Sequence, residues 1–175
     1  MNEIATSLGR VFWGFLFVIL DVSFNHSDLL PDFIGYILVA VGLGGLRGLS
    51  ARFATARTYA WVLASASLLA LLPWGDLGFV IGLISLGLDC AMMWSLLGGI
   101  MDYSAARDRP DLTERASNRR VAYVSLMCVV TFLAFIARGI GAPAGLLAAA
   151  TVVCLVVLLV MILHLIHRVR VELAT

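Results

Sequence analysis

An apolar run over residues 77–101 is the feature that most constrains how this chain folds. About 20 apolar residues in a helix span the ~30 Å hydrocarbon core of a bilayer, so this run is long enough to cross one. Asp89 lies near its middle. An ionisable group at that depth costs roughly 2.5–3.5 kcal/mol on insertion scales, so it requires a partner, a water-filled cavity or a function. Asp89 is therefore the first candidate for a site.

The composition extends this conclusion to the whole chain. Of its 175 residues, 62% are hydrophobic and 13% are charged, and the mean hydropathy is +1.02. Soluble domains average about 45–50% apolar and ~25% charged residues. A core of this size cannot hide the excess, because a small globule leaves much of its surface in water. The sequence predicts a polytopic membrane protein whose solvent is the lipid bilayer. The net charge of +1 gives no indication of a nucleic acid partner.

The division of the chain into apolar segments predicts an all-α fold in a single integral membrane domain over residues 1–175. In lipid, an open chain satisfies its backbone polar groups only as helices. The six-transmembrane-helix bundle predicted from the apolar segments has helices at about 9–24, 33–49, 58–74, 77–101, 121–138 and 144–166. The main connection covers residues 102–120. The first segment is short and contains Asp21, so five spans plus a re-entrant first helix is the alternative.

The distribution of positive charge predicts the topology. All twelve basic residues are arginines, which hints at a GC-rich bacterial genome. With six spans, eleven of them fall on one side and only Arg138 falls on the other. The positive-inside rule then places both termini and residues 102–120 in the cytoplasm. The expected location is the bacterial inner membrane.

A group of polar residues is predicted near the outer face. Asp21, Asn25 and Asp28 have the spacing of one helical face. The other members at that depth are His26, Asp32 and Asp76. Together they could form a vestibule for a hard cation or for protons. The alternative for Asp32 is structural, because it follows a proline at a helix start, where an acid complements the helix dipole.

Two of the acids, Asp21 and Asp89, suggest specific partners. Asp21 lies inside an apolar run, and its obvious partner is Arg138 at the outer end of the fifth segment. Asp89 has Ser85 one turn away on its own helix. Tyr36 and Arg138 belong to other helices and lie nearer the outer face. Asp89 is either a proton or cation relay or a neutral acid hydrogen-bonded to a neighbouring helix.

Glycine spacing predicts close helix approach. Gly44 and Gly48 are four residues apart, as are Gly78 and Gly82, and Gly35 and Gly42 add to the second segment. Such spacing lets backbones come together. Packing within the chain is the expected use, and a homo-oligomer interface is the alternative.

The sequence LPDFIGYIL at residues 30–38 resembles a segment found in small, uncharacterised bacterial multipass membrane proteins. The resemblance covers about one helix start. It implies a shared helix start and a shared fold, and it brings no activity with it.

These observations favour a small transporter, a channel-like protein or a transport accessory, with a polar path for a small ion or molecule through Asp89. The alternative is a structural or assembly subunit of a larger membrane complex. A lipid-acting membrane enzyme is a third reading, but no nucleophile elbow or paired-histidine zinc motif is present. No cofactor or metal site is predicted: a lone His beside carboxylates lacks the three or four converging ligands of a metal site.

Overall fold

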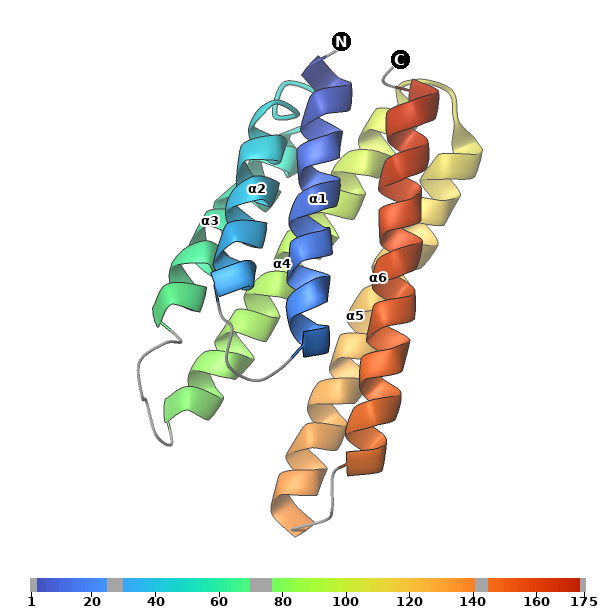
Figure 1. Ribbon diagram of the computed structural model, residues 1–175. Coiled ribbons are helices and arrows are strands. Elements are labelled where there is room, and N and C mark those ends of the chain that lie inside the picture. The colour runs from blue at the N-terminus through green and yellow to red at the C-terminus, as the bar shows by residue number, and fades with distance from the viewer. Residues whose placement is uncertain (1–2, 25–29, 70–76, 141–144, 174–175) are drawn as a thin grey trace.

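The computed structural model describes residues 3–24, 30–69, 77–140 and 145–173, and the regular structure in these ranges is entirely α-helical (Figure 1). The helices are α1 (Glu3–Phe24), α2 (Leu30–Gly44), α3 (Ala51–Leu69), α4 (Leu77–Ala105), α5 (Pro110–Ile140) and α6 (Gly145–Leu173). The predicted all-α class and the number of helices are confirmed.

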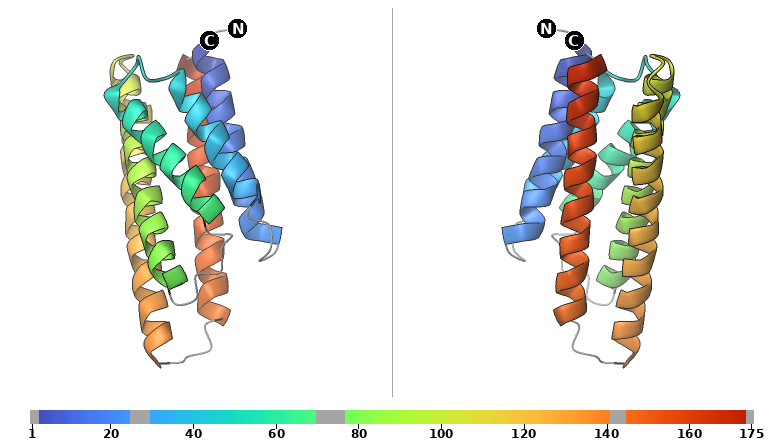
Figure 2. Two further views of the ribbon diagram at one scale, coloured as in Figure 1. Left: turned by 90° about the vertical axis from the view of Figure 1, so that its left-hand side faces the viewer. Right: turned by 90° about the vertical axis from the view of Figure 1, so that its right-hand side faces the viewer.

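The six helices form a closed ring. Each helix contacts the next along the chain, and α6 returns to contact α1. The two termini lie at the same end of the bundle as the α2–α3 and α4–α5 connections, which we call the terminal end (Figure 1). At the opposite end, α5 and α6 extend further than α1 and α2 (Figure 2). An even number of antiparallel helices accounts for both termini lying at one end.

Two stretches of the described residues are long and apolar enough to cross a membrane, namely Val80–Ala105 and Val153–Glu172. A shorter apolar stretch covers Asp32–Gly44. Two such stretches are a modest indication of membrane association, and they do not confirm the six-span bundle. In α3 the reason is physical, because its first two turns carry Arg52 and Arg57, which lowers the mean hydropathy of this short helix.

Every helix except α2 is longer than its predicted apolar segment. The prediction that the second helix continues to residue 49 is wrong, because α2 ends at Gly44 and turns follow over residues 45–49. Instead of a connection over residues 102–120, α4 continues to Ala105 and α5 begins at Pro110. Proline is favoured at a first helical position, because its missing N–H would have no helical partner there. Hydropathy failed here because the first turns of α5 are polar outside but bury Leu112 and Ala116. Similarly, α1 begins at Glu3 and α3 at Ala51.

Glycines allow α1 and α2 to pack with their backbones almost in contact. A Cβ atom on Gly14 would lie 2.7 Å from the carbonyl oxygen of Gly35, and one on Gly42 would lie 2.7 Å from that of Ser7. The expected close packing is thus confirmed for Gly35 and Gly42. By contrast, Gly48 and Gly82 face open space, with nothing within 4 Å of an added Cβ.

The buried core lies toward the terminal end. In α4, the fully buried side chains begin at Met92 and continue through Met93, Leu96, Leu97 and Ile100. The described side chains over residues 77–91 are all half-buried or exposed. Asp89 therefore lies one turn beyond the edge of the core, where tight packing ends.

Candidate functional site

The Asp89 side chain joins three helices. The Tyr36 hydroxyl of α2 donates a hydrogen bond to Asp89 Oδ1 at 3.3 Å. The Tyr123 hydroxyl of α5 donates a hydrogen bond to Asp89 Oδ2. In the described ranges, the backbone of α2 contacts neither α4 nor α5. The three side chains therefore meet across the interior of the ring, and Asp89 points into the bundle.

Burial differs among the three members of this cluster, which we call the Asp89 cluster. Tyr123 is buried, with 3% of its surface exposed. Asp89 and Tyr36 are half-buried, and Tyr36 packs against the apolar core. Each carboxylate oxygen accepts a hydrogen bond from one hydroxyl, and no arginine among the described side chains forms an ion pair with the acid. Such a group can accept a proton or a small cation while the hydroxyls stay in place.

The structure brings together Asp89 and Tyr36 from the predicted set, but it gives Ser85 no part in the cluster. Ser85 is half-buried. The side-chain hydrogen bonds of Asp89 within the described ranges go to the tyrosines. Packing between helices, rather than the intrahelical spacing of four residues, decides the partner.

Sequence reasoning missed Tyr123, although a signal for it exists. The buried face of α5 consists of Leu112, Ala116, Arg119, Tyr123 and Met127. Steps of three and four residues are the signature of one helix face. A helix predicted to start at Pro110 would have shown that Tyr123 continues the buried stripe of Leu112 and Ala116. A helix predicted to start at residue 121 leaves that stripe out.

Of the remaining predicted site residues, only Asp32 has a side chain within the described part of the structure. Asp32 is half-buried in the first turn of α2, as the helix-start interpretation expects. Asp21 and Arg138 belong to α1 and α5, but their side chains are outside the described part of the structure, as are His26, Asp28, Asn25 and Asp76. The Asp21–Arg138 pair and the outer vestibule therefore stay predictions.

Ion pairs join the helices at the terminal end. Arg109, just before α5, pairs with Asp111 at 3.1 Å and also with Glu172 at the end of α6. Arg168 pairs with the same Glu172 at 2.7 Å. The hydrogen bond from Arg109 holds the pKa of Asp111 below its usual value. On α4, Asp102 accepts a hydrogen bond from Ser50 at 2.6 Å. These contacts hold the helix ends together and form no reactive constellation.

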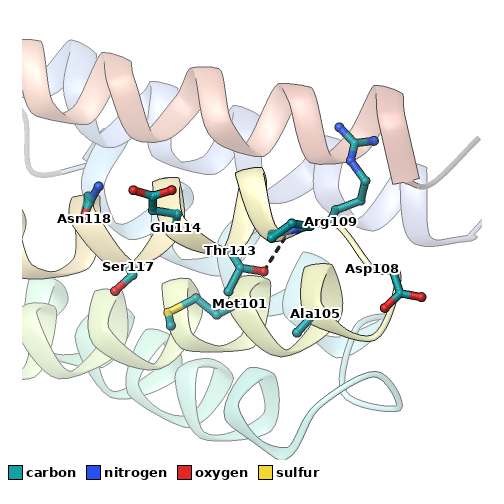
Figure 3. A pocket seen from close by; sticks show the side chains of 9 residues that line it. Met101, Ala105, Asp108, Arg109, Thr113, Glu114, Ser117 and Asn118 are labelled. Atoms are coloured by element: carbon teal, nitrogen blue, oxygen red, sulfur yellow. Dashed lines mark hydrogen bonds between the residues drawn. The ribbon is translucent and has the colours of Figure 1, made fainter.

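A groove at the terminal end is the second candidate site. It has a volume of about 820 Å³ and lies between the end of α4 and the first turns of α5 (Figure 3). Its lining residues are Met101, Ala105, Asp108, Arg109, Pro110, Thr113, Glu114, Ser117 and Asn118. The Thr113 hydroxyl donates a hydrogen bond to the Arg109 carbonyl oxygen at 3.2 Å. The Arg109 guanidinium donates hydrogen bonds to two carboxylates. The lining contains no His or Cys, and it pairs no nucleophile with a base.

Metal binding finds no support in the described residues, where no three His, Cys, Asp or Glu side chains converge. No protein-family model matches the chain, and no curated protein or solved structure matches it either. Function must therefore be inferred from the geometry of the Asp89 cluster and from the surface of the bundle.

Proposed function

We propose that this protein is a small multipass membrane transporter, channel-like protein or transport accessory whose Asp89 cluster accepts protons or a small cation inside the bundle. The observation that supports this most directly is the carboxylate of Asp89, held by one hydroxyl from α2 and one from α5. Ionisable groups in membrane interiors usually mark ion or proton pathways, because their insertion is costly.

Support for the bilayer comes from the surface of the bundle. Large apolar side chains are exposed on all six helices, among them Leu77 on α4 and Phe132 and Phe135 on α5, each at least 60% exposed. Soluble monomers rarely expose large areas of apolar side chains. The exposed apolar side chains therefore support a location in the lipid bilayer.

Tryptophans support a position for the bilayer boundary. Exposed Trp13, Trp61 and Trp94 lie ten or eleven residues from the terminal end of their helices. At ~1.5 Å per residue, each is about 15 Å from that end. The Arg120 guanidinium lies over the Trp94 ring, 3.4 Å from its centre. Arg120 is also the last charged residue before the apolar part of α5 begins at Val121. Trp belts occupy membrane interfaces, so we place the cytoplasmic boundary at this level.

This boundary predicts a topology in which the terminal end is cytoplasmic. After replacement of Cys90, Cys128 and Cys154 by serine, Arg107→Cys should react with an impermeant maleimide only in permeabilised cells, because it lies between α4 and α5. Ala142→Cys, between α5 and α6, should react in intact cells. The reverse labelling pattern would contradict the proposed orientation.

The Asp89→Asn variant tests transport. Wild-type protein in vesicles should pass protons, followed with an internal pH dye, or sodium or potassium, followed with a dye selective for each ion, when a gradient is imposed. Asn keeps the size of Asp89 but does not ionise, so the flux should fall at least about tenfold, as expected for loss of a positioned proton carrier. Asp108→Asn, in the exposed connection before α5, is the matched control and should keep wild-type flux. Absence of wild-type flux for all three ions, or equal flux in Asp89→Asn, would refute the proposal.

The second candidate is an assembly subunit in which Asp89 ties helices together. Gly82 and Gly87 favour it, because both are exposed on α4 and face open space, as a surface for close contact with another helix would be. This candidate expects folded Asp89→Asn protein, no flux in either protein, and recovery of the chain as a stable complex.

A further inference from the structure

Arg119 is a buried cation in an unusual position. It lies on the inward face of α5, one turn closer to the terminal end than Tyr123, and only 8% of its surface is exposed. Its Nη1 atom is fully buried and has no hydrogen-bond partner among the described residues. A buried donor without an acceptor is costly, and a buried charge is more so. Such an atom requires an acceptor from outside the described chain.

The charged neighbours of Arg119 increase this cost. Burial is the main cause that lowers the pKa of Arg119, and the positive charges of Arg115 and Arg168 lower it further. The carboxylate of Glu172 is occupied by Arg109 and Arg168. Counting Arg109, Arg115, Arg119 and Arg168 against Asp111, Glu114 and Glu172, this part of the bundle carries one positive charge in excess.

We propose that Arg115, Arg119 and Arg168 form a binding site for a phosphate group between α5 and α6. Guanidinium groups donate paired hydrogen bonds to phosphate oxygens, which would satisfy Arg119 Nη1 and offset the repulsion among the three arginines. Arg119 precedes Arg120, which stacks on Trp94, so the site lies at the level where lipid phosphates are expected. The same chemistry would also suit a soluble phosphate. The proposal does not depend on Asp89.

The two sources are distinguished by stabilisation of the purified protein in neutral detergent. Unfolding is followed by tryptophan fluorescence with added phosphatidylglycerol, phosphatidylcholine or inorganic phosphate at constant ionic strength. Stabilisation by phosphatidylglycerol, with a weaker effect of phosphatidylcholine, identifies a lipid headgroup. Stabilisation by inorganic phosphate alone identifies a soluble ligand. No stabilisation by any of the three would overturn the proposal.

Variants separate binding from packing. Arg119→Gln should lower the apparent affinity at least about tenfold, as expected for loss of a charged hydrogen bond. Without ligand it should be no less stable than wild type, because a repulsive charge is removed. The exposed Arg115→Gln should lose about fivefold, the effect of one arginine at a membrane surface. Arg47→Gln, an exposed change of equal charge between α2 and α3, is the control and should keep wild-type affinity. Unchanged affinity in Arg119→Gln, or equal destabilisation with and without ligand, would show a purely structural role.

Discussion

The Gly14→Ala variant is expected to lose about 2 kcal/mol or more of its free energy of unfolding. The added Cβ would lie 2.7 Å from the Gly35 carbonyl oxygen and 2.8 Å from the Val39 backbone nitrogen. Backbone atoms of a packed helix cannot rotate away as a side chain can, so α1 and α2 must separate. Overpacking of this kind typically costs ~1–3 kcal/mol. Denaturation followed by tryptophan fluorescence measures the loss.

The Gly87→Ala variant is the matched control. Gly87 is a helical glycine with nothing within 4 Å of an added Cβ. Alanine is the better helix former by about 0.5–1 kcal/mol, so this variant should be neutral or slightly stabilised. If both alanine variants changed stability equally, the close approach of α1 and α2 would not contribute as described.

The second large effect is expected at Asp89. Asp89→Ala leaves the Tyr36 and Tyr123 hydroxyls without their acceptor, and each unsatisfied buried group costs ~1–3 kcal/mol. Tyr123 should carry most of the loss, because it is buried and Tyr36 is half-buried. Tyr123→Phe alone should cost between about 0.6 and ~1.7 kcal/mol, which are the average and the maximum for hydrogen bonds between membrane helices. Tyr36→Phe should cost less.

A double-mutant cycle tests whether the three side chains act together. In the Asp89→Ala background, Tyr123→Phe should no longer destabilise, because its hydrogen bond is already lost. Full additivity of the two losses would mean that Tyr123 stabilises the bundle through packing rather than through Asp89.

An energetic argument predicted from the sequence that Asp89 requires a partner, and Tyr36 and Tyr123 are such partners. A carboxylate in a long apolar run requires compensation wherever the other helices lie. The sequence placed Tyr36 nearer the outer face than Asp89, whereas in the structure its hydroxyl reaches the Asp89 carboxylate. Tyr123 could not be placed near Asp89, because the predicted helix began at residue 121 and omitted the inward stripe of Leu112 and Ala116. Hydropathy finds the apolar part of a helix but not polar turns that pack on one side only.

The glycines show a different limit of the sequence. Gly35 and Gly82 both lie in apolar helical segments, yet one meets the backbone of α1 and the other meets nothing. The difference depends on how the neighbouring helix crosses, which a single sequence does not contain. Gly14 was missed for the same reason, since its role comes entirely from the position of α2.

The glycine contacts between α1 and α2 also have a mechanical consequence. Because the backbones of these two helices are in close contact, we expect α1 and α2 to move as one rigid unit that carries Tyr36. Asp89 and Tyr123 belong to α4 and α5, whose backbones contact each other but neither α1 nor α2 within the described ranges. The Tyr36–Asp89 bond of 3.3 Å is already longer than the usual range for a hydroxyl donor. A small displacement of α1 and α2 relative to α4 would therefore break the Tyr36–Asp89 hydrogen bond first. One carboxylate oxygen would then be free, while the other would still accept the hydrogen bond from Tyr123.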